Sequence, residues 1–230
     1  MHTDVRCVVA IDGPSGTGKS TVSRRLATAI GARYLDTGAM YRAVTWAVLD
    51  AGIDPDDSQS VADICAKVTL DSGTDPLAPH ISVDGRSLDV EIRIAEVTAA
   101  VSVIAAVPDV RVLLVARQRE IIAETRRIVV EGRDIASVVA PNADLKVYLT
   151  ASEAERAQRR SLEIAGGAQA SAATIARTRA DLARRDALDS SRATDPFRRA
   201  DDAVVVDTTG VDIDAVVAVL LDLVKRKDAQ

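Results

Sequence analysis

The fold of this chain is decided by the stretch Gly13-Pro14-Ser15-Gly16-Thr17-Gly18-Lys19-Ser20. It matches G-x-x-x-x-G-K-[ST] at every fixed position, between an apolar segment over residues 5–11 and helical spacing over residues 22–30. This order predicts a strand, a phosphate-binding loop (P-loop) and a helix, because glycines let backbone N–H groups approach phosphate oxygens and adopt positive φ. The helix points its partly positive N-terminus at the same anion. A glycine turn without a ligand is the alternative, and the flanking strand and helix argue against it.

Two residues of the P-loop carry predicted chemistry. Lys19 is expected to reach the β- and γ-phosphates of a nucleoside triphosphate, and the Ser20 hydroxyl is expected to bind Mg²⁺. The motif therefore predicts a nucleotide site and leaves the second substrate open.

The composition restricts the class of protein. At 230 residues the chain suits one α/β domain with insertions, and 47% hydrophobic residues exclude general disorder. A net charge of -5 argues against a nucleic-acid polymer or a membrane surface as partner. No apolar run reaches the roughly 18 residues of a membrane span, and the N-terminus lacks a signal-peptide pattern. We therefore expect a cytoplasmic protein.

Cysteine and histidine offer little chemistry in this chain. Cys7 and Cys65 lack ligand-like spacing and are predicted to be buried thiols. His2 is near the N-terminus and His80 is in a loop, so neither is placed like a catalytic base or a metal ligand. Because aromatic residues make up only 2%, a nucleobase would be held mainly by hydrogen bonds.

Strands and helices alternate through most of the chain, which predicts a parallel sheet with right-handed crossovers. Strands are expected within residues 5–11, 31–38, 127–130, 144–149 and 203–206, and helices over residues 39–51, 110–125, 152–165, 174–188 and 211–225. Ser152 and Glu155 form a capping box at the start of one helix. Ligands of such sheets bind beyond the carboxyl ends of the strands, which places the site beside the P-loop.

The pattern changes between residues 54 and 108. Short strands over residues 67–71, 80–83 and 86–90, with a turn at Asp84-Gly85, predict an antiparallel sheet, and a helix is expected after them over residues 92–106. We therefore predict a P-loop three-layer α/β fold with a five-stranded parallel sheet, formed by residues 1–53 and 109–228. A mixed or antiparallel subdomain over residues 54–108 is inserted into it, and residues 152–170 form a short helical lid.

Arginines where predicted strands meet loops indicate a second anion beside the triphosphate. Arg42 and Arg133 follow strands, and Arg185 and Arg192 come later in the chain. Because arginine binds phosphate through two hydrogen bonds and stays charged, their number favours a phosphorylated acceptor. Such an acceptor is already ionised and needs no general base.

Other arginines lie on predicted helices. Three of these arginines share one helix face and are expected to form a closing lid over the triphosphate: Arg156, Arg159 and Arg160. A solvated basic face is the alternative. Solvated charge is the expectation for Arg177, Arg179 and Arg184.

Four motifs in order resemble those of the bacterial cytidylate kinase family. Besides the P-loop, they are Tyr34-Leu35-Asp36-Thr37-Gly38-Ala39-Met40-Tyr41-Arg42, Glu131-Gly132-Arg133-Asp134 and Arg185-Asp186-Ala187-Leu188-Asp189-Ser190-Ser191-Arg192. The insert is similar as well, through Glu91-Ile92-Arg93 and Val107-Pro108-Asp109-Val110-Arg111. The resemblance covers nearly the whole chain. It implies transfer of the ATP γ-phosphoryl group to CMP or dCMP with Mg²⁺, in pyrimidine nucleotide metabolism, and the binding subdomain for the monophosphate in the insert.

The resemblance also implies roles for residues at matching positions. The implied catalytic residues are Lys19, Arg133 and Arg185. The implied contacts to ATP are Gly13, Pro14, Ser15, Gly16, Thr17, Gly18, Lys19, Ser20, Thr21, Arg156, Arg159 and Arg160. CMP would be held through its phosphate by Arg42 and Arg133, through its sugar by Arg185 and Asp189, and through cytosine by Thr37, Ser102, Arg111, Asp134 and Arg192. Ser20 would bind the metal, with Glu131 where an acid helps to hold Mg²⁺ through water. A monomer is expected, since each site is complete within one chain.

The residues also indicate which base fits. Cytosine offers an amine donor beside a ring-nitrogen acceptor, which Asp134 and an arginine match, whereas uracil reverses both groups. We therefore expect poor activity on UMP.

Two alternatives remain open. Another P-loop small-molecule kinase would keep the P-loop without requiring the later arginine motifs. An ATP-dependent binding or switch module would bind nucleotide without acceptor-dependent turnover. A GTP switch would need Asn-Lys-x-Asp, and Asn142, the only asparagine, lies in Pro-Asn-Ala-Asp.

Overall fold

The structure, a computed structural model, describes residues 6–228. His2 and the predicted start of the first strand at Val5 lie outside the described residues. Within them, a parallel five-stranded sheet has the order β2-β6-β1-β7-β8, which confirms the predicted fold class. Its strands are β1 (Cys7–Asp12), β2 (Arg33–Asp36), β6 (Arg127–Gly132), β7 (Leu145–Thr150) and β8 (Val204–Asp207). Because β1 is central, the P-loop after it emerges in the middle of the carboxyl edge.

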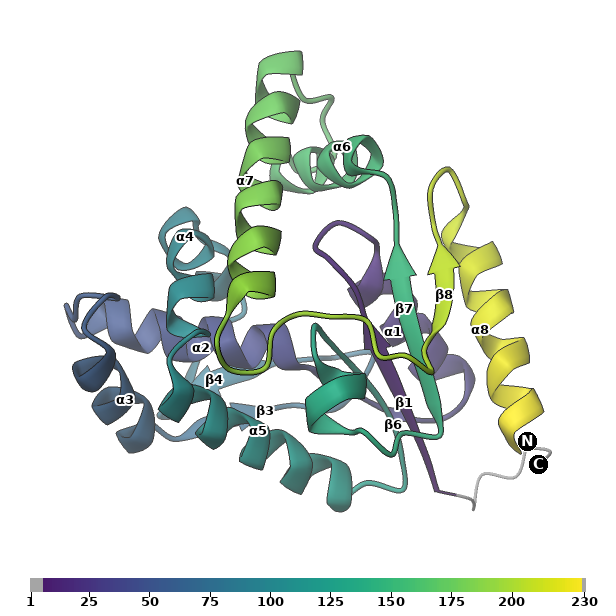
Figure 1. The fold of residues 1–230 in the computed structure, drawn as a ribbon, viewed down its shortest axis with the longest axis horizontal. Helices are drawn as coiled ribbons and strands as arrows, with labels where there is room; N and C mark the ends of the chain where they lie inside the picture. Colours follow the sequence, from purple (N-terminus) through teal and green to yellow (C-terminus); the bar gives the residue numbers. More distant parts are fainter. Residues whose placement is uncertain (1–5, 229–230) are drawn as a thin grey trace.

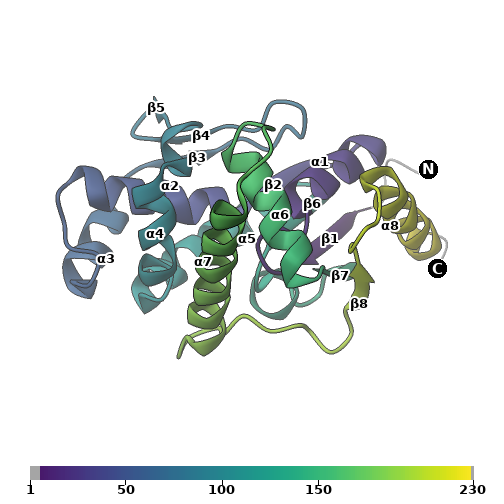
Figure 2. The same cartoon turned by 90° about the horizontal axis from the view of Figure 1, so that it is seen from above.

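Helices cover both faces of this sheet and make three layers (Figures 1 and 2). One face packs against α1 (Lys19–Ala29) and α8 (Ile213–Asp228), and the other against α2 (Thr37–Asp50) and α5 (Pro108–Ala123). In β1, Val9 and Ile11 belong to the apolar cluster on the α1 side, whereas Val8 and Ala10 belong to the cluster on the α2 side. Both faces of the strand are therefore buried, which explains its continuous apolar run.

The insert forms a separate antiparallel sheet in the order β3-β4-β5. Its elements are α3 (Ser58–Lys67), β3 (Leu70–Ser72), β4 (Ile81–Val83), β5 (Arg86–Ser87), the 3₁₀ helix η1 (Glu91–Arg93) and α4 (Ala95–Ile104). Asp84 and Gly85 have φ of 50° and 78° and close the predicted hairpin. Val61 and Ile81 of the insert belong to the same apolar cluster as Leu35 of β2, so insert and sheet share one core.

A helical hairpin stands beyond the carboxyl ends of the strands. It consists of α6 (Glu153–Ile164) and α7 (Ala172–Ser191), which pack together; in Figure 1, α6 lies above the arrowhead of β7 and α7 stands to its left. Ser152 caps α6 as predicted, because its hydroxyl oxygen accepts a hydrogen bond of 3.3 Å from the N–H of Glu155. Residues 192–203 then return to β8 without helix or strand.

Two strands of the insert differ from the prediction. Lys67, predicted in a strand, is the last residue of α3, and β3 begins only at Leu70. The strand predicted over residues 86–90 ends at Ser87, although the N–H of Leu88 still donates a hydrogen bond of 2.9 Å to the Ile81 carbonyl oxygen. The Leu88 side chain is completely buried. Both strands are therefore shorter than predicted, with three residues in β3 and two in β5.

Helix boundaries differ as well. α2 begins at Thr37, earlier than predicted, because the Asp36 side chain accepts a hydrogen bond from the N–H of Ala39 and caps the helix. The helix predicted over residues 92–106 is divided into η1 and α4, and a π-helix, η2 (Ile135–Val139), was not predicted. Within residues 6–228, no single helix has the length and apolarity to cross a membrane; α4 and α5 together have both but are bent by 98°.

Candidate active site

A cleft of about 980 Å³ opens between the P-loop, the insert and the α6–α7 hairpin. Predicted site residues that line it are Ser15, Gly16, Gly18, Lys19, Ser20, Thr21, Arg42, Arg133, Arg159, Arg160 and Arg185. These residues come from both predicted groups, the one for the triphosphate and the one for the acceptor. The structure therefore brings the two groups to one cavity.

The P-loop wraps around its own lysine. Lys19 Nζ donates a hydrogen bond of 2.9 Å to the Pro14 carbonyl oxygen. Gly16 has a φ of 83°, and a Cβ there would lie 2.8 Å from the carbonyl oxygen of Arg156, so only glycine fits against α6. Burial, followed by the positive charge of Arg133, lowers the pKa of Lys19 to about 8. A phosphate bound here would oppose both effects, because its negative charge favours the protonated lysine.

Ser20 lies beside a buried acid at the end of β6. The Tyr34 hydroxyl donates to a carboxylate oxygen of Glu131, and the Ser20 side chain beside the same carboxylate favours its ionised form. Burial, with the negative charge of Asp36, raises the pKa of Glu131 to about 7. A cation at this position would favour the ionised form of Glu131.

Several arginines form the opposite, positive side of the cleft. The pKa of Arg42 is lowered to about 9 and that of Arg185 to about 10, by burial first and then by neighbouring arginines that include Arg160. Arg42 Nη1 is oriented by the Ile92 carbonyl oxygen at 3.1 Å and by Thr98 Oγ1 at 2.9 Å, both from the insert. Converging cations repel one another, and an anion between them removes that repulsion.

Arg133 is fixed by acids of α7 and by the P-loop. Its Nη1 lies 3.0 Å from a carboxylate oxygen of Asp186, and its Nε lies 2.8 Å from one of Asp189. Its Nη2 donates to Ser15 Oγ at 2.8 Å, and its guanidinium lies 5.1 Å from the ring centroid of Phe197. Four contacts therefore hold this side chain at the mouth of the P-loop.

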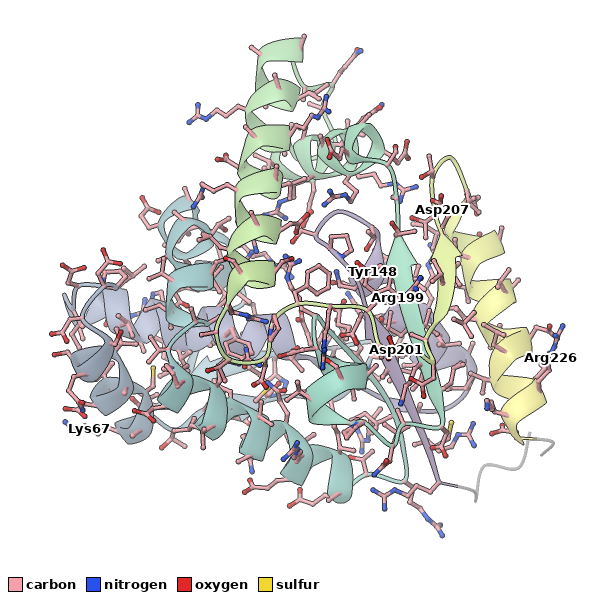
Figure 3. All side chains as sticks on the ribbon, viewed as in Figure 1. Lys67, Tyr148, Arg199, Asp201, Asp207 and Arg226 are labelled. Atoms are coloured by element: carbon pink, nitrogen blue, oxygen red, sulfur yellow. The ribbon has the colours of Figure 1, made fainter. Side chains whose placement is uncertain are left out.

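Two stacked aromatic rings, one of them beside the Arg133 guanidinium, support this arrangement. The rings of Phe197 and Tyr148 are stacked with centroids 6.0 Å apart, and Figure 3 shows Tyr148 at the centre of the molecule. Because Phe197 belongs to the irregular segment after α7, the sequence pattern gave no sign of this contact.

Arg156 of α6 is joined to Arg133 through a shared acid. Its Nη1 lies 2.6 Å from the second carboxylate oxygen of Asp186 and donates to the Ser15 carbonyl oxygen at 3.2 Å. Arg156 therefore packs behind the P-loop and does not line the cleft, unlike Arg159. Asp186 stands directly after Arg185 in one of the sequence motifs, but the sequence pattern assigned it no role.

The other two predicted lid arginines are paired within and beside α6. Arg159 Nε lies 2.9 Å from a Glu155 oxygen, and its Nη2 donates to the Thr208 carbonyl oxygen at 2.7 Å. Arg160 Nη1 lies 2.7 Å from a Glu163 oxygen. Both side chains thus line the cleft from α6, with one acidic neighbour each.

A second polar cluster is buried beside the first turn of α5. Arg111, 1% exposed, pairs with Asp134 and lies 5.7 Å from the Tyr41 ring centroid, and Arg192 Nη2 lies 3.9 Å from the same Asp134 carboxylate. Asp195 lies 3.0 Å from Arg111 Nε. Arg111 Nη1, Arg192 Nε and the Tyr41 hydroxyl have no hydrogen-bond partner among residues 6–228. Buried polar groups are rarely unsatisfied, so these three atoms require hydrogen-bond partners that the described residues do not supply.

Thr37 and Ser102, which were also predicted to contact the base, are both buried. Thr37 Oγ1 donates to the Glu131 carbonyl oxygen at 2.7 Å, and Ser102 is buried on α4. Gly132 allows the first contact, since a Cβ there would lie 2.6 Å from Thr37 Oγ1. The predicted P-loop residues outside the cleft lining are buried in the loop itself: Gly13, Pro14 and Thr17.

Asp12 is a site residue that the sequence pattern did not reveal. Its two carboxylate oxygens accept hydrogen bonds of 2.8 Å each from the N–H groups of Ile135 and Ala136, at the start of η2. It thereby connects the strand before the P-loop to the backbone directly after Asp134. Burial raises the pKa of Asp12 to about 6. An acid at the end of a buried strand, next to the P-loop, was the available signal.

A central P-loop, a hydroxyl beside a buried acid, and arginines facing them across one cleft define the class of P-loop small-molecule kinases. The family model of cytidylate kinase matches residues 9–226. The chain is 53% identical over 228 residues to a cytidylate kinase of Nocardia farcinica (strain IFM 10152), covering 99% of this chain and 97% of that protein. It is 52% identical over 220 residues to one of Rhodococcus opacus (strain B4), covering 96% and 95%. The chain belongs to the cytidylate kinase family, as its motifs predicted.

One solved structure is similar in fold. The crystal structure of an uncharacterized protein from Eubacterium ventriosum ATCC 27560 matches with a TM-score of 0.53 and 14% identity, covering 98% of this chain and 99% of that one. At this identity the likeness concerns the fold alone.

Proposed function

We propose that this protein transfers the γ-phosphoryl group of ATP to the phosphate of CMP and dCMP, giving ADP and CDP or dCDP. The observation that carries the proposal is the single cleft with two anion-binding sides, the P-loop on one and Arg42, Arg133 and Arg185 on the other. Phosphoryl transfer needs two phosphates held end to end and positive charge around the transferred group. The geometry supports both requirements.

The donor end would hold ATP and Mg²⁺. Lys19 neutralises charge on the β- and γ-phosphates, and the P-loop backbone binds their oxygens. Ser20 and Glu131 suit Mg²⁺, which prefers oxygen ligands and takes the rest from phosphate and water. Residues 6–228 contain no group of three or more His, Cys, Asp or Glu that could hold a metal ion. When bound, Mg²⁺ supplies charge that stabilises the transferring phosphoryl group.

The acceptor end would hold CMP without a general base, because its phosphate is already ionised. Arg42, Arg133 and Arg185 orient that phosphate and balance its charge. The unsatisfied donors of the Arg111 and Arg192 side chains would meet acceptors of cytosine, and Asp134 would accept from its amine. We place the subdomain that binds the monophosphate in residues 54–108 and the lid in residues 152–170, in a monomer that works in the cytoplasm.

ADP release tests the proposal directly. With ATP and Mg²⁺ present, CMP, dCMP, UMP, AMP, GMP and no acceptor are compared. We expect turnover with CMP and dCMP and weak turnover with UMP, because uracil would leave buried polar groups unpaired. Release that no nucleotide stimulates would refute the acceptor assignment and favour a binding or switch module. Release stimulated by a different class of phosphorylated or hydroxyl acceptor would favour another P-loop kinase.

A further inference from the structure

Asp195, which belongs to none of the sequence motifs, has an unusual backbone. Its φ is 48°, and Asp84 at the insert hairpin is the other non-glycine residue with positive φ within residues 6–228. Positive φ is strained for residues other than glycine, although Asp tolerates it better than most. Such strain persists where surrounding contacts enforce it, and these positions cluster at functional sites.

The contacts of Asp195 go to both arginines of the buried polar cluster. Its carboxylate lies 3.0 Å from Arg111 Nε. Its carbonyl oxygen accepts a hydrogen bond of 2.9 Å from Arg192 Nη2. Side chain and backbone of one residue, held at a positive φ, thus contact two guanidinium groups.

These contacts decide which N–H groups remain for a ligand. On Arg111, Asp195 occupies Nε and Asp134 occupies Nη2, which leaves Nη1 without a partner among the described residues. On Arg192, Nε remains. The carboxylates of Asp134 and Asp195 also balance the charges of the two arginines, so the cluster presents selected donors with no net charge.

We propose that Asp195 is a positioning residue that makes this cluster selective for cytosine over uracil. The inference rests on the proposed function, which places the base here. Without the Asp195 carboxylate, Arg111 Nε would become a further free donor in a cluster of net positive charge. Uracil presents a carbonyl where cytosine presents an amine, so a free Arg111 Nε–H donor favours uracil. When the Asp195 carboxylate accepts from this N–H, cytosine is favoured.

Substitution by glycine separates this role from backbone strain. Asp195→Gly removes the carboxylate and keeps a residue that adopts positive φ without cost. Asp195→Asn keeps a carbonyl oxygen for Arg111 Nε and a residue tolerant of this conformation. Asp84→Gly is the matched control, because Asp84 has a φ of 50° and its side chain accepts a hydrogen bond from the N–H of Thr69, in the insert hairpin.

Kinetics with ATP and Mg²⁺ test the proposal. For Asp195→Gly, we expect KM for CMP to rise roughly 10-fold to 100-fold, the effect of a lost hydrogen bond to a charged group, with KM for ATP unchanged. The ratio of kcat/KM for CMP to that for UMP should fall, and Asp195→Asn should restore part of KM for CMP. The Asp84→Gly variant should keep the wild-type ratio.

The outcomes separate this inference from the proposed function. An unchanged CMP-to-UMP ratio in Asp195→Gly overturns the role of Asp195. An equal rise of KM for CMP and for ATP also overturns it. So does a loss of activity that is explained by a lowered melting temperature, as it would be in Asp84→Gly, because both results indicate a structural role. If the wild type itself shows no preference for CMP, the proposed function has failed, whatever the variants do.

Discussion

Substitution of Arg133 tests whether the acceptor side of the cleft contributes to phosphoryl transfer separately from ATP binding. Arg133→Ala would remove a cation from the acceptor side and leave Asp186 and Asp189 without this partner. Asp189 is only 4% exposed. Removing one group that stabilises charge in the transition state costs roughly 10²-fold to 10³-fold in kcat. We expect a loss of that size in kcat/KM for CMP. Unfolding free energy should fall by about 1–3 kcal/mol, because a buried acid loses a partner.

ATP binding should respond much less. Among the described residues, Arg133 is joined to the P-loop by one hydrogen bond, of 2.8 Å to Ser15 Oγ. A hydrogen bond of this kind contributes about 1 kcal/mol, so the Kd for ATP should rise by no more than about 5-fold. Steady-state ADP release with varied CMP measures the first effect, and calorimetric titration with ATP measures the second.

Two further variants serve as controls for Arg133→Ala. Arg133→Lys keeps the charge but loses the forked geometry, and should have intermediate activity. Arg184→Ala changes an exposed arginine of the same helix, α7, that supplies Asp186 and Asp189, and should match the wild type. Equal losses of ATP binding and transfer in Arg133→Ala would refute the reasoning, because Arg133 would then serve the donor site or the fold.

Three further predictions concern the supporting structure. The pKa of Glu131 is about 7 in the fold against 4.5 for the free side chain, so its ionisation destabilises the protein as pH rises from about 5 to about 7. The neutral variant Glu131→Gln should therefore melt above the wild type at about pH 8, and a gap that stays constant down to about pH 5 would contradict this. Ser152→Ala removes the cap of α6 and should lower unfolding free energy by about 1 kcal/mol in urea titration, with faster amide exchange in the first turn of α6; unchanged exchange there would argue against the cap. Gly132→Ala would place a Cβ 2.6 Å from Thr37 Oγ1 and from the Ile135 side chain, and should cost about 1–3 kcal/mol and raise KM for CMP, whereas normal values of both would show that the neighbours can move.

Much of the fold could be predicted because local pattern and tertiary structure agree. The apolar runs of β1 and β6 are buried on both faces, and the P-loop motif determines the loop and the helix after β1. The order of strands in the sheet was not predicted, since it depends on long-range pairing. The end of the strand predicted over residues 86–90 was misplaced, because the complete burial of Leu88 depends on contacts that neighbours in sequence do not reveal.

The residues of the site could likewise be predicted only in part. Lys19, Ser20 and Arg133 could be placed at the cleft because motifs and strand ends determine their positions. The acids that hold the arginines were missed, because Asp186 lies on a charged helix where a solvated pair is the ordinary expectation. Asp195 lies in residues 192–203, which have neither helix nor strand, so periodicity offers no information there. The partners of an arginine become visible only when segments far apart in the chain are brought together.

The core that insert and sheet share limits how the molecule can move. Val61, Ile81 and Leu88 of the insert are buried in one cluster with Leu35 of the sheet, and α2 packs against both parts. Swinging the insert outward on a hinge would expose this cluster to water, at about 25 cal/mol for each Å² of apolar surface. Sliding of packed helices against one another keeps it covered. Closure over nucleotides is therefore expected to proceed by small shear displacements, and thermal unfolding to occur in one cooperative transition.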